Sequence, residues 1–321
     1  MAARDVPQVR DLLGGRLPNG EYAVFAIRLQ GAGTPQHVTT WSAADGLVDH
    51  PRTERGLWGD EYVAGVGDDG RMTALGTAGF EDEPGYWGFG RLALLRLDPV
   101  TGEWGKGITR RYETKGIRGV DLDVAADGSV VASYLRYRST ASHWPDAPDT
   151  SVWLLRKQPG TPPTLAAMSE RTRDVFAVDS GITGAGVGVV AWQQGRPGSP
   201  ASTWRTHWPA DTPAPVHATR LERGESTPGV GAGHGVSLAV DADGSTVLAW
   251  VSRDASGTSA TAWAAPAGAR RPNDDNSREW TGSRNAAVTS TAGASGTAAV
   301  ILGQVRWYGV LGATADLSYR P

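Results

Sequence analysis

A short turn that ends in glycine recurs six times along the chain, and its regular spacing limits the folds that are open to it. Intervals of 50, 58, 58, 58 and 52 residues separate the turn glycines, which are Gly20, Gly70, Gly128, Gly186, Gly244 and Gly296. A run of small and β-branched residues follows each glycine. A period of this length is typical of repeat architectures, in which one supersecondary unit is copied around or along an axis.

The third and fifth copies show most clearly what one unit contains. Over residues 120–136 and 236–252, alternating apolar residues lie on both sides of an Asp-Gly turn, as in a β-hairpin whose glycine adopts a positive φ. Two further short runs follow in each copy, and the first often carries a tryptophan. Each unit therefore contains four short antiparallel strands, as does a propeller blade of similar length. The chain has no sustained 3.6-residue apolar period that would favour a helical solenoid.

These units predict an all-β fold, namely a six-bladed β-propeller with four antiparallel strands per blade, in one domain over residues 1–321. The sixth copy supplies only three strands, at 286–291, 297–304 and 311–319. We expect the N-terminal segment 3–10 to supply the missing strand, so that the ring is closed by N- and C-terminal strands. Closure of this kind leaves no long edge strand exposed.

The pattern of a valine followed by Ala-Asp-Gly, within 120–128 and 236–244, resembles that of bacterial β-propellers of the broad NHL-like and lectin-like kind. The resemblance covers the whole chain. It implies a ring fold and no particular activity, because propellers include lectins, scaffolds for protein partners, glycosidases and lyases. The heavy use of Ala, Gly, Arg, Asp and Trp is typical of a high-GC bacterium.

The chain has 13 tryptophans, which are spread over all six copies. Large aromatic rings fill the gaps between splayed sheets, so we expect the tryptophans within strands to be buried between neighbouring blades. These residues are Trp41, Trp153, Trp192, Trp204, Trp250 and Trp263.

Charge and composition argue against several classes of partner and chemistry. A net charge of −3 gives no electrostatic reason to expect nucleic acid or an anionic membrane as a partner. The absence of cysteine excludes disulfides, zinc–thiolate sites and thiol catalysis. No apolar stretch reaches the length of a membrane helix, and the first residues lack the apolar core of a signal peptide. We therefore expect no membrane insertion, and either a cytoplasmic protein or a secreted domain without its signal.

Motifs for cofactors, metals and covalent catalysis are missing from the sequence. No two of the six histidines stand three to five residues apart, and no acidic cluster matches a calcium loop. The chain also lacks a Gly-x-Ser-x-Gly elbow and a Walker-type glycine loop. We expect no cofactor and no metal, although a metal site assembled from different blades stays open.

The connections between second and third strands are the first candidate for a binding site, because binding residues concentrate on loops held by a rigid scaffold. Segments 80–89 and 142–149 both place acidic residues beside aromatic ones. The residues nominated are Glu81, Asp82, Glu83, Tyr86, Trp87, His143, Trp144, Asp146 and Asp149. Aromatic faces stack on sugars and carboxylates bind hydroxyl groups, so these are the ingredients of a carbohydrate site. The alternative is that long loops simply accumulate solvated acidic residues and prolines.

A second candidate is the position eight residues after each turn glycine, near the end of the second strand. Its residues are Arg28, Ala78, Arg136, Gln194, Ser252 and Gln304. The arginines and glutamines would line a polar funnel, where Arg28 and Arg136 would hold a carboxylate or phosphate, with Trp307 near the same rim. Alternatively, each pairs with a neighbouring acidic side chain or reaches solvent.

The sequence thus favours a non-catalytic binding module that recognises a glycan or a protein partner through its loop face. Two alternatives stay open. One is a structural docking platform in a larger assembly. The other is a glycan-active hydrolase or lyase, which needs two carboxylates at a defined separation. Its candidates are Glu81, Asp82, Glu83, Asp146 and Asp149.

Overall fold

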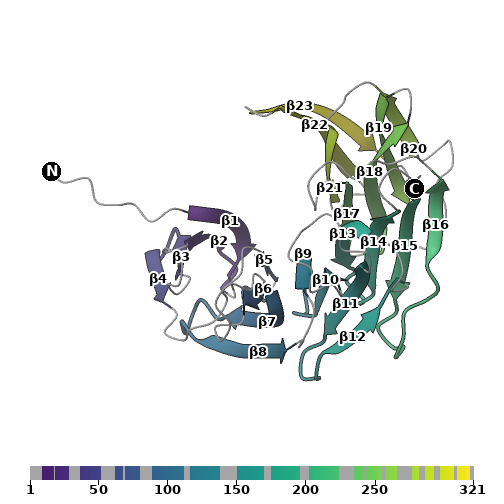
Figure 1. The fold of residues 1–321 in the computed structure, drawn as a ribbon. Coiled ribbons are helices and arrows are strands. Elements are labelled where there is room, and N and C mark those ends of the chain that lie inside the picture. The colour runs from purple at the N-terminus through teal and green to yellow at the C-terminus, as the bar shows by residue number, and fades with distance from the viewer. Residues whose placement is uncertain are drawn as a thin grey trace. The chain divides into compact units, whose positions relative to one another are not determined.

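A computed structural model of the chain consists of β-strands and turns, and its described residues contain no helix (Figure 1). The described residues are 9–17, 19–28, 37–51, 62–67, 69–79, 89–111, 116–137, 150–169, 175–195, 202–223, 235–241, 243–254, 257–265, 277–281, 286–292, 297–306 and 309–318. The prediction of an all-β fold is confirmed.

The chain divides into two compact units. The first comprises Met1–Glu113 with Ala126–Gly128, and the second comprises Thr114–Ala125 with Ser129–Pro321. We describe each unit by itself, and the single domain over 1–321 stays a prediction.

The first unit contains two four-stranded antiparallel sheets, in each of which the strands pair in chain order. The strands of the first sheet are β1 (Val9–Arg16), β2 (Tyr22–Arg28), β3 (His37–Ser42) and β4 (Gly46–Pro51). The strands of the second sheet are β5 (Tyr62–Val66), β6 (Met72–Gly79), β7 (Phe89–Leu97) and β8 (Trp104–Arg111).

The second unit contains four antiparallel sheets, again with strands paired in chain order. The third sheet is β9 (Gly116–Val124), β10 (Val130–Tyr137), β11 (Thr150–Lys157) and β12 (Thr164–Ala167). The fourth is β13 (Val175–Ile182), β14 (Gly188–Gln194), β15 (Ser202–Trp208) and β16 (Thr219–Arg223). The fifth is β17 (Val236–Val240), β18 (Thr246–Asp254), β19 (Gly257–Ala265) and β20 (Ser277–Thr281). The sixth is β21 (Ala286–Ala292), β22 (Thr297–Arg306) and β23 (Gly309–Ser318).

The six copies seen in the sequence are thus six sheets. Five have the four strands that were predicted, and the sixth has three strands in the described part of the chain. Of the segment 3–10 that we expected to close the ring, residues 3–8 lie outside the described residues. Val9 and Arg10 belong to β1, where Val9 is in register with Arg28 of β2. Closure by the terminal strands stays a prediction.

The turn between the first and second strands has the same backbone in the five sheets where it is described. The N–H of the residue three before the glycine donates to the carbonyl of the residue after it, at 2.7–3.1 Å. Each glycine has a positive φ, as expected for a type I turn closed by a residue in the left-handed region. The φ values are 89° at Gly20, 73° at Gly70, 79° at Gly128, 76° at Gly186 and 91° at Gly244. The sixth glycine, Gly296, lies outside the described residues.

Neighbouring sheets also pack in a repeated way, through their first strands. In both units, a glycine five residues before the turn glycine lies against a valine four residues before the next turn glycine. The pairs are Gly15 with Val66, and Gly181 with Val240. At the same position of the third sheet, Asp123 accepts a hydrogen bond from Ile182 N at 2.9 Å. One stacking relation therefore recurs along the chain, as copies related by rotation require.

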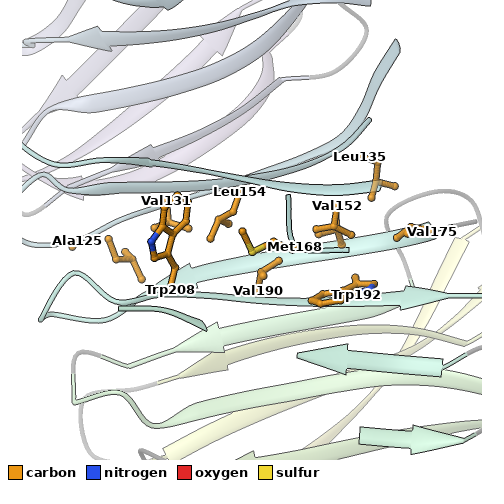
Figure 2. Packing of buried hydrophobic residues seen from close by; sticks show 12 residues of the cluster. Ala125, Val131, Leu135, Val152, Leu154, Met168, Val175, Val190, Trp192 and Trp208 are labelled. Atoms are coloured by element: carbon orange, nitrogen blue, oxygen red, sulfur yellow. The ribbon is translucent and has the colours of Figure 1, made fainter. Parts of the chain in front are cut away.

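The cores lie between neighbouring sheets. In the second unit, Val131, Val152 and Leu154 of the third sheet pack against Trp192 and Trp208 of the fourth (Figure 2). Another cluster joins the fourth sheet to the fifth through Ala177, Ala191, Leu248, Trp250 and Trp263. In the first unit, Phe25, Ile27 and Val38 pack against Met72 and Leu97. Within each unit, these neighbouring sheets thus bury a face against each other.

Most tryptophans within strands fill these cores, as predicted. Trp192, Trp250 and Trp263 are fully buried, and the ring of Trp192 stacks on Trp204 with centroids 6.3 Å apart. The expectation is wrong for Trp41, which is 49% exposed. Trp41 is in register with the exposed Val24 and therefore lies on the face of the first sheet that points away from the second.

Candidate functional site

The turns from first to second strands are more uniform in length than the connections from second to third strands. We call the edge where the second and third strands are joined the loop edge. At the opposite edge the turn from first to second strand has five residues in the first five sheets, at 17–21, 67–71, 125–129, 183–187 and 241–245, and four in the sixth, at 293–296. At the loop edge the connections span 29–36, 80–88, 138–149, 195–201, 255–256 and 307–308. The connections from second to third strands thus vary more than the turns from first to second strands, and variable loops on a repeated scaffold are where functional residues are usually found.

The longest connections from second to third strands are the two that the sequence analysis selected. Segment 138–149 joins β10 to β11, and segment 80–88 joins β6 to β7. Their predicted position between second and third strands is therefore confirmed in both sheets. The nominated side chains lie outside the described residues, so their placement stays a prediction. They are Glu81, Asp82, Glu83, Tyr86, Trp87, His143, Trp144, Asp146, Asp149 and Trp307.

Of the second candidate set, Arg28 and Gln304 lie in β2 and β22, and their side chains lie outside the described residues. Arg136 lies at the base of the longest loop, next to the last register pair of β10 and β11. Its guanidinium carbon is 4.8 Å from the ring centroid of Trp153, a cation–π distance. Trp153 Nε1 donates to Ser151 Oγ at 3.0 Å, and Ser151 Oγ donates to the Arg136 carbonyl at 3.4 Å. This network fixes both strands from which the loop emerges.

Gln194 occupies the equivalent position in the fourth sheet and is buried. Its Oε1 accepts a hydrogen bond from Trp192 Nε1 at 3.0 Å, on the face of β14 that packs against the third sheet. The neighbouring Gln193 was not nominated, and it also links sheets, since its Nε2 donates to the carbonyl of Val251 at 2.9 Å. Both glutamines thus hold the scaffold, and a ligand contact by Gln194 stays a prediction.

A cluster of carboxyl groups between first strands was missed in the sequence. Asp121 Oδ2 accepts hydrogen bonds from Ser180 N at 2.8 Å and from Ser180 Oγ at 2.7 Å. Asp179 Oδ2 accepts a hydrogen bond of 2.7 Å from the N–H of Leu238, a residue of the next sheet. Asp121 and Asp179 both stand seven residues before their turn glycine, so numbering the copies from that glycine would have revealed them.

Burial changes the proton affinity of this cluster. It raises the pKa of Asp123, although the N–H groups of Ile182 and Val124 oppose the rise. It raises the pKa of Asp179 well above the usual value, and the nearby Asp121 adds to the effect. These carboxyl groups hold strands together, because backbone N–H groups of the next sheet occupy their oxygens.

Two arginines stack on tryptophans of the next sheet. The guanidinium carbon of Arg156 is 4.6 Å from the ring centroid of Trp208, and that of Arg205 is 5.4 Å from Trp263. Burial lowers the pKa of Arg205 to about 10, which leaves it charged at neutral pH. These pairs add to the packing between the third, fourth and fifth sheets.

Among the described residues, no group of three His, Asp or Glu side chains is placed to hold a metal ion. The same residues include no helix long and apolar enough to cross a membrane.

No family model matches the chain, and no curated protein does either. Solved structures do match. A protein of unknown function from Dyadobacter fermentans gives a TM-score of 0.55 at 12% identity, covering 98% of each chain. An ulvan lyase of polysaccharide lyase family PL25, bound to a GlcA–Rha3S oligosaccharide, gives 0.54 at 10% identity, covering 98% of this chain and 82% of that one. Hydrazine synthase from Kuenenia stuttgartiensis gives 0.52 at 13% identity, covering 99% and 85%.

Together with the repeated antiparallel sheets, these matches show the class of fold, which is the β-propeller. A propeller of this kind is shared by a glycan-active enzyme and by proteins with unrelated chemistry, so the fold alone does not define an activity.

Proposed function

We propose that the chain is a non-catalytic, lectin-like binding module that recognises a glycan through the loop edges of its sheets. The contrast between the short turns from first to second strands and the variable connections from second to third strands carries this proposal. The sequences of connections 80–88 and 138–149 each contain aromatic and acidic residues, whereas only two residues, 255–256, join β18 to β19. A repeated scaffold that carries elaborated loops is what a recognition protein needs.

The residue types at these loops suit sugars. Trp87 and Trp144 would stack on the C–H faces of pyranose rings, and the carboxylates of Asp146 and Asp149 would accept hydrogen bonds from hydroxyl groups. Arg136 at the base of the longer loop would add a cation for an acidic sugar, held in place by its contact with Trp153.

Catalysis is the weaker alternative. A retaining or inverting glycosidase needs two carboxyl groups that face the substrate at a defined separation. The carboxyl groups that the described residues bring together are Asp121, Asp123 and Asp179, and backbone N–H groups occupy their oxygens. A hydrolase or lyase would have to use the acidic residues of segments 80–88 and 138–149.

A glycan array run beside a screen for hydrolysis and elimination products tests the proposal. We expect binding of the full chain to a defined class of glycan and no product. Release of product would contradict the non-catalytic assignment and favour the enzyme. If the array shows no binding and the screen shows no product, glycan recognition is contradicted, and a protein partner is left as the ligand. Trp41→Ala is the control, because Trp41 is exposed but lies near the opposite edge of its sheet, one residue before β3 ends.

A further inference from the structure

Two carboxyl groups from neighbouring sheets share one backbone N–H. Ser180 N donates to Asp121 Oδ2 at 2.8 Å and to Asp179 Oδ1 at 2.9 Å. Asp121 lies on β9 and Asp179 on β13, at the same position relative to their turn glycines. The amide hydrogen of Ser180 thus lies beside two carboxyl oxygens. If both carboxyl groups were ionised, their negative charges would repel strongly, because both groups accept this one hydrogen in a buried site.

The ionisable groups around this pair come from the strands packed against β13. From β9 these are Asp121 and Asp123, with Arg118, whose side chain lies outside the described residues. The sequences of β14 and β17 contain no ionisable side chain. The sequences of β10 and β11 add Tyr134, Tyr137, Arg136, Arg156 and Lys157, and the side chain of Tyr137 lies outside the described residues.

The cations of β10 and β11 have other contacts. Arg136 lies over Trp153, and Arg156 donates to the carbonyls of Pro209 and Thr212. Lys157 Nζ donates to the carbonyl oxygens of Gln158 and Thr161, at 2.8 and 2.6 Å. Burial and the neighbouring Asp121 disfavour the charged form of the Asp179 carboxyl, and the backbone N–H groups of Leu238 and Ser180 favour it.

We propose that Asp121 and Asp179 hold a single proton between them over the pH range in which ordinary aspartates are fully ionised, and that this proton locks the third, fourth and fifth sheets together. Asp121 is the acceptor of the shared proton, since its Oδ2 already accepts two hydrogen bonds from Ser180. Asp179 carries the proton and donates it to Asp121, while its oxygens still accept the N–H groups of Ser180 and Leu238. Two like charges are thereby replaced by one charge and a hydrogen bond.

The shared proton makes the stability of this junction depend on pH in a defined direction. A carboxyl group whose pKa is higher in the folded than in the unfolded chain contributes its full stability below the unfolded value of 3.8. That contribution is lost as the pH rises through the folded value. The junction is therefore closed in acid and loosens toward alkaline pH, as the pair loses its proton and the two charges repel. This property is independent of the glycan proposal.

Infrared spectroscopy of the full chain, labelled with 13C-aspartate, tests the proposal directly. We expect the carbonyl band of a protonated aspartic acid at pH 6, where ordinary aspartates give only carboxylate bands. In Asp179→Asn that band should disappear. In Asp121→Asn the band should be lost at a lower pH than in the native chain, because the neighbouring charge is gone.

Asp98→Asn is the matched control. Asp98 is held by Arg71 at 3.0 Å and by backbone N–H groups, and its pKa is lowered despite partial burial. This variant should keep the band. Absence of the band from the native chain at pH 6 would overturn the proposal even if Asp179→Asn failed to fold. Persistence of the full band in Asp179→Asn, or its loss in Asp98→Asn, would overturn it as well.

Discussion

Gly181 of β13 lies against Val240 of β17 so closely that a Cβ on the glycine would overlap the valine side chain. Gly15 has the same relation to Val66 in the first unit. Both glycines stand five residues before a turn glycine, and both valines stand four before the next. The absence of a side chain at this position therefore sets how closely first strands of neighbouring sheets approach.

Gly15→Ala should destabilise the first unit by about 1–3 kcal/mol, the usual cost of forcing an extra methyl group into a packed core. Gly14→Ala is the control on the same strand, because a Cβ at Gly14 would meet no atom within 4 Å. Urea denaturation measures both changes. Equal stability of the two variants would show that the approach of β1 to β5 is not limited by Gly15.

Gly20→Ala tests the turn that repeats along the chain. The φ of Gly20 is +89° and the nearest atom to an added Cβ is Arg16 Nη2 at 3.9 Å, so strain in the backbone is the main cost. We expect a loss of about 1–2 kcal/mol in the free energy of unfolding. Gly20→Asn should lose less, because asparagine tolerates the left-handed region better than alanine. If alanine were tolerated as well as asparagine, the turn geometry assigned to this repeat would be wrong.

His50 makes the first unit sensitive to acid. Its ring is buried, and Nε2 forms a hydrogen bond of 2.8 Å with Thr40 Oγ1. Burial lowers the pKa of His50 below 6.5, although Asp49 opposes the shift. The unfolded chain then takes up a proton near pH 6.5 that the folded chain does not, so stability falls as the pH drops from 6.5 through the folded value.

His50→Gln should flatten this part of the pH profile of the urea midpoint between pH 8 and pH 5. His217→Gln, at an exposed histidine, should leave the profile as it is in the native chain. A profile that keeps its slope in His50→Gln would assign the acid sensitivity to another group.

Trp192→Ala should destabilise the second unit by about 3–5 kcal/mol, because the ring is fully buried between the third and fourth sheets. Trp41→Ala should cost much less, since its ring is half exposed. Thermal unfolding of the two variants compares them directly. A near-neutral Trp192→Ala would contradict the packing between these sheets.

The hairpin turns could be predicted from the sequence because a positive φ at glycine is a local property of the backbone. Whether a tryptophan is buried or exposed depends on which face of its strand packs against another sheet, and composition does not reveal that face. Trp192 and Trp41 both lie in strands, yet one is core and the other is not. The partnership of Asp121 with Asp179 depends on stacking between strands 58 residues apart, which hydrophobic patterning does not encode.

The candidate site also has features that could be predicted from the sequence and features that could not. The position of the two long loops between second and third strands followed from counting strands, and it is confirmed. The burial of Gln194 could not be predicted from the sequence. Gln194 and Trp192 form their hydrogen bond on the face of β14 that packs against the third sheet, and the sequence does not show which face packs there.

The most direct test of glycan recognition is a calorimetric titration of the array's best glycan into the native chain and into the double variant Trp87→Ala, Trp144→Ala. Each stacked ring lost should weaken binding by about 0.5–1.5 kcal/mol beyond its lost contact area, so we expect the double variant to bind at least about 1–3 kcal/mol more weakly while the thermal midpoint stays nearly unchanged. Unchanged affinity would contradict the assignment of these loops as the binding site. Loss of folding would show that the two rings belong to the core.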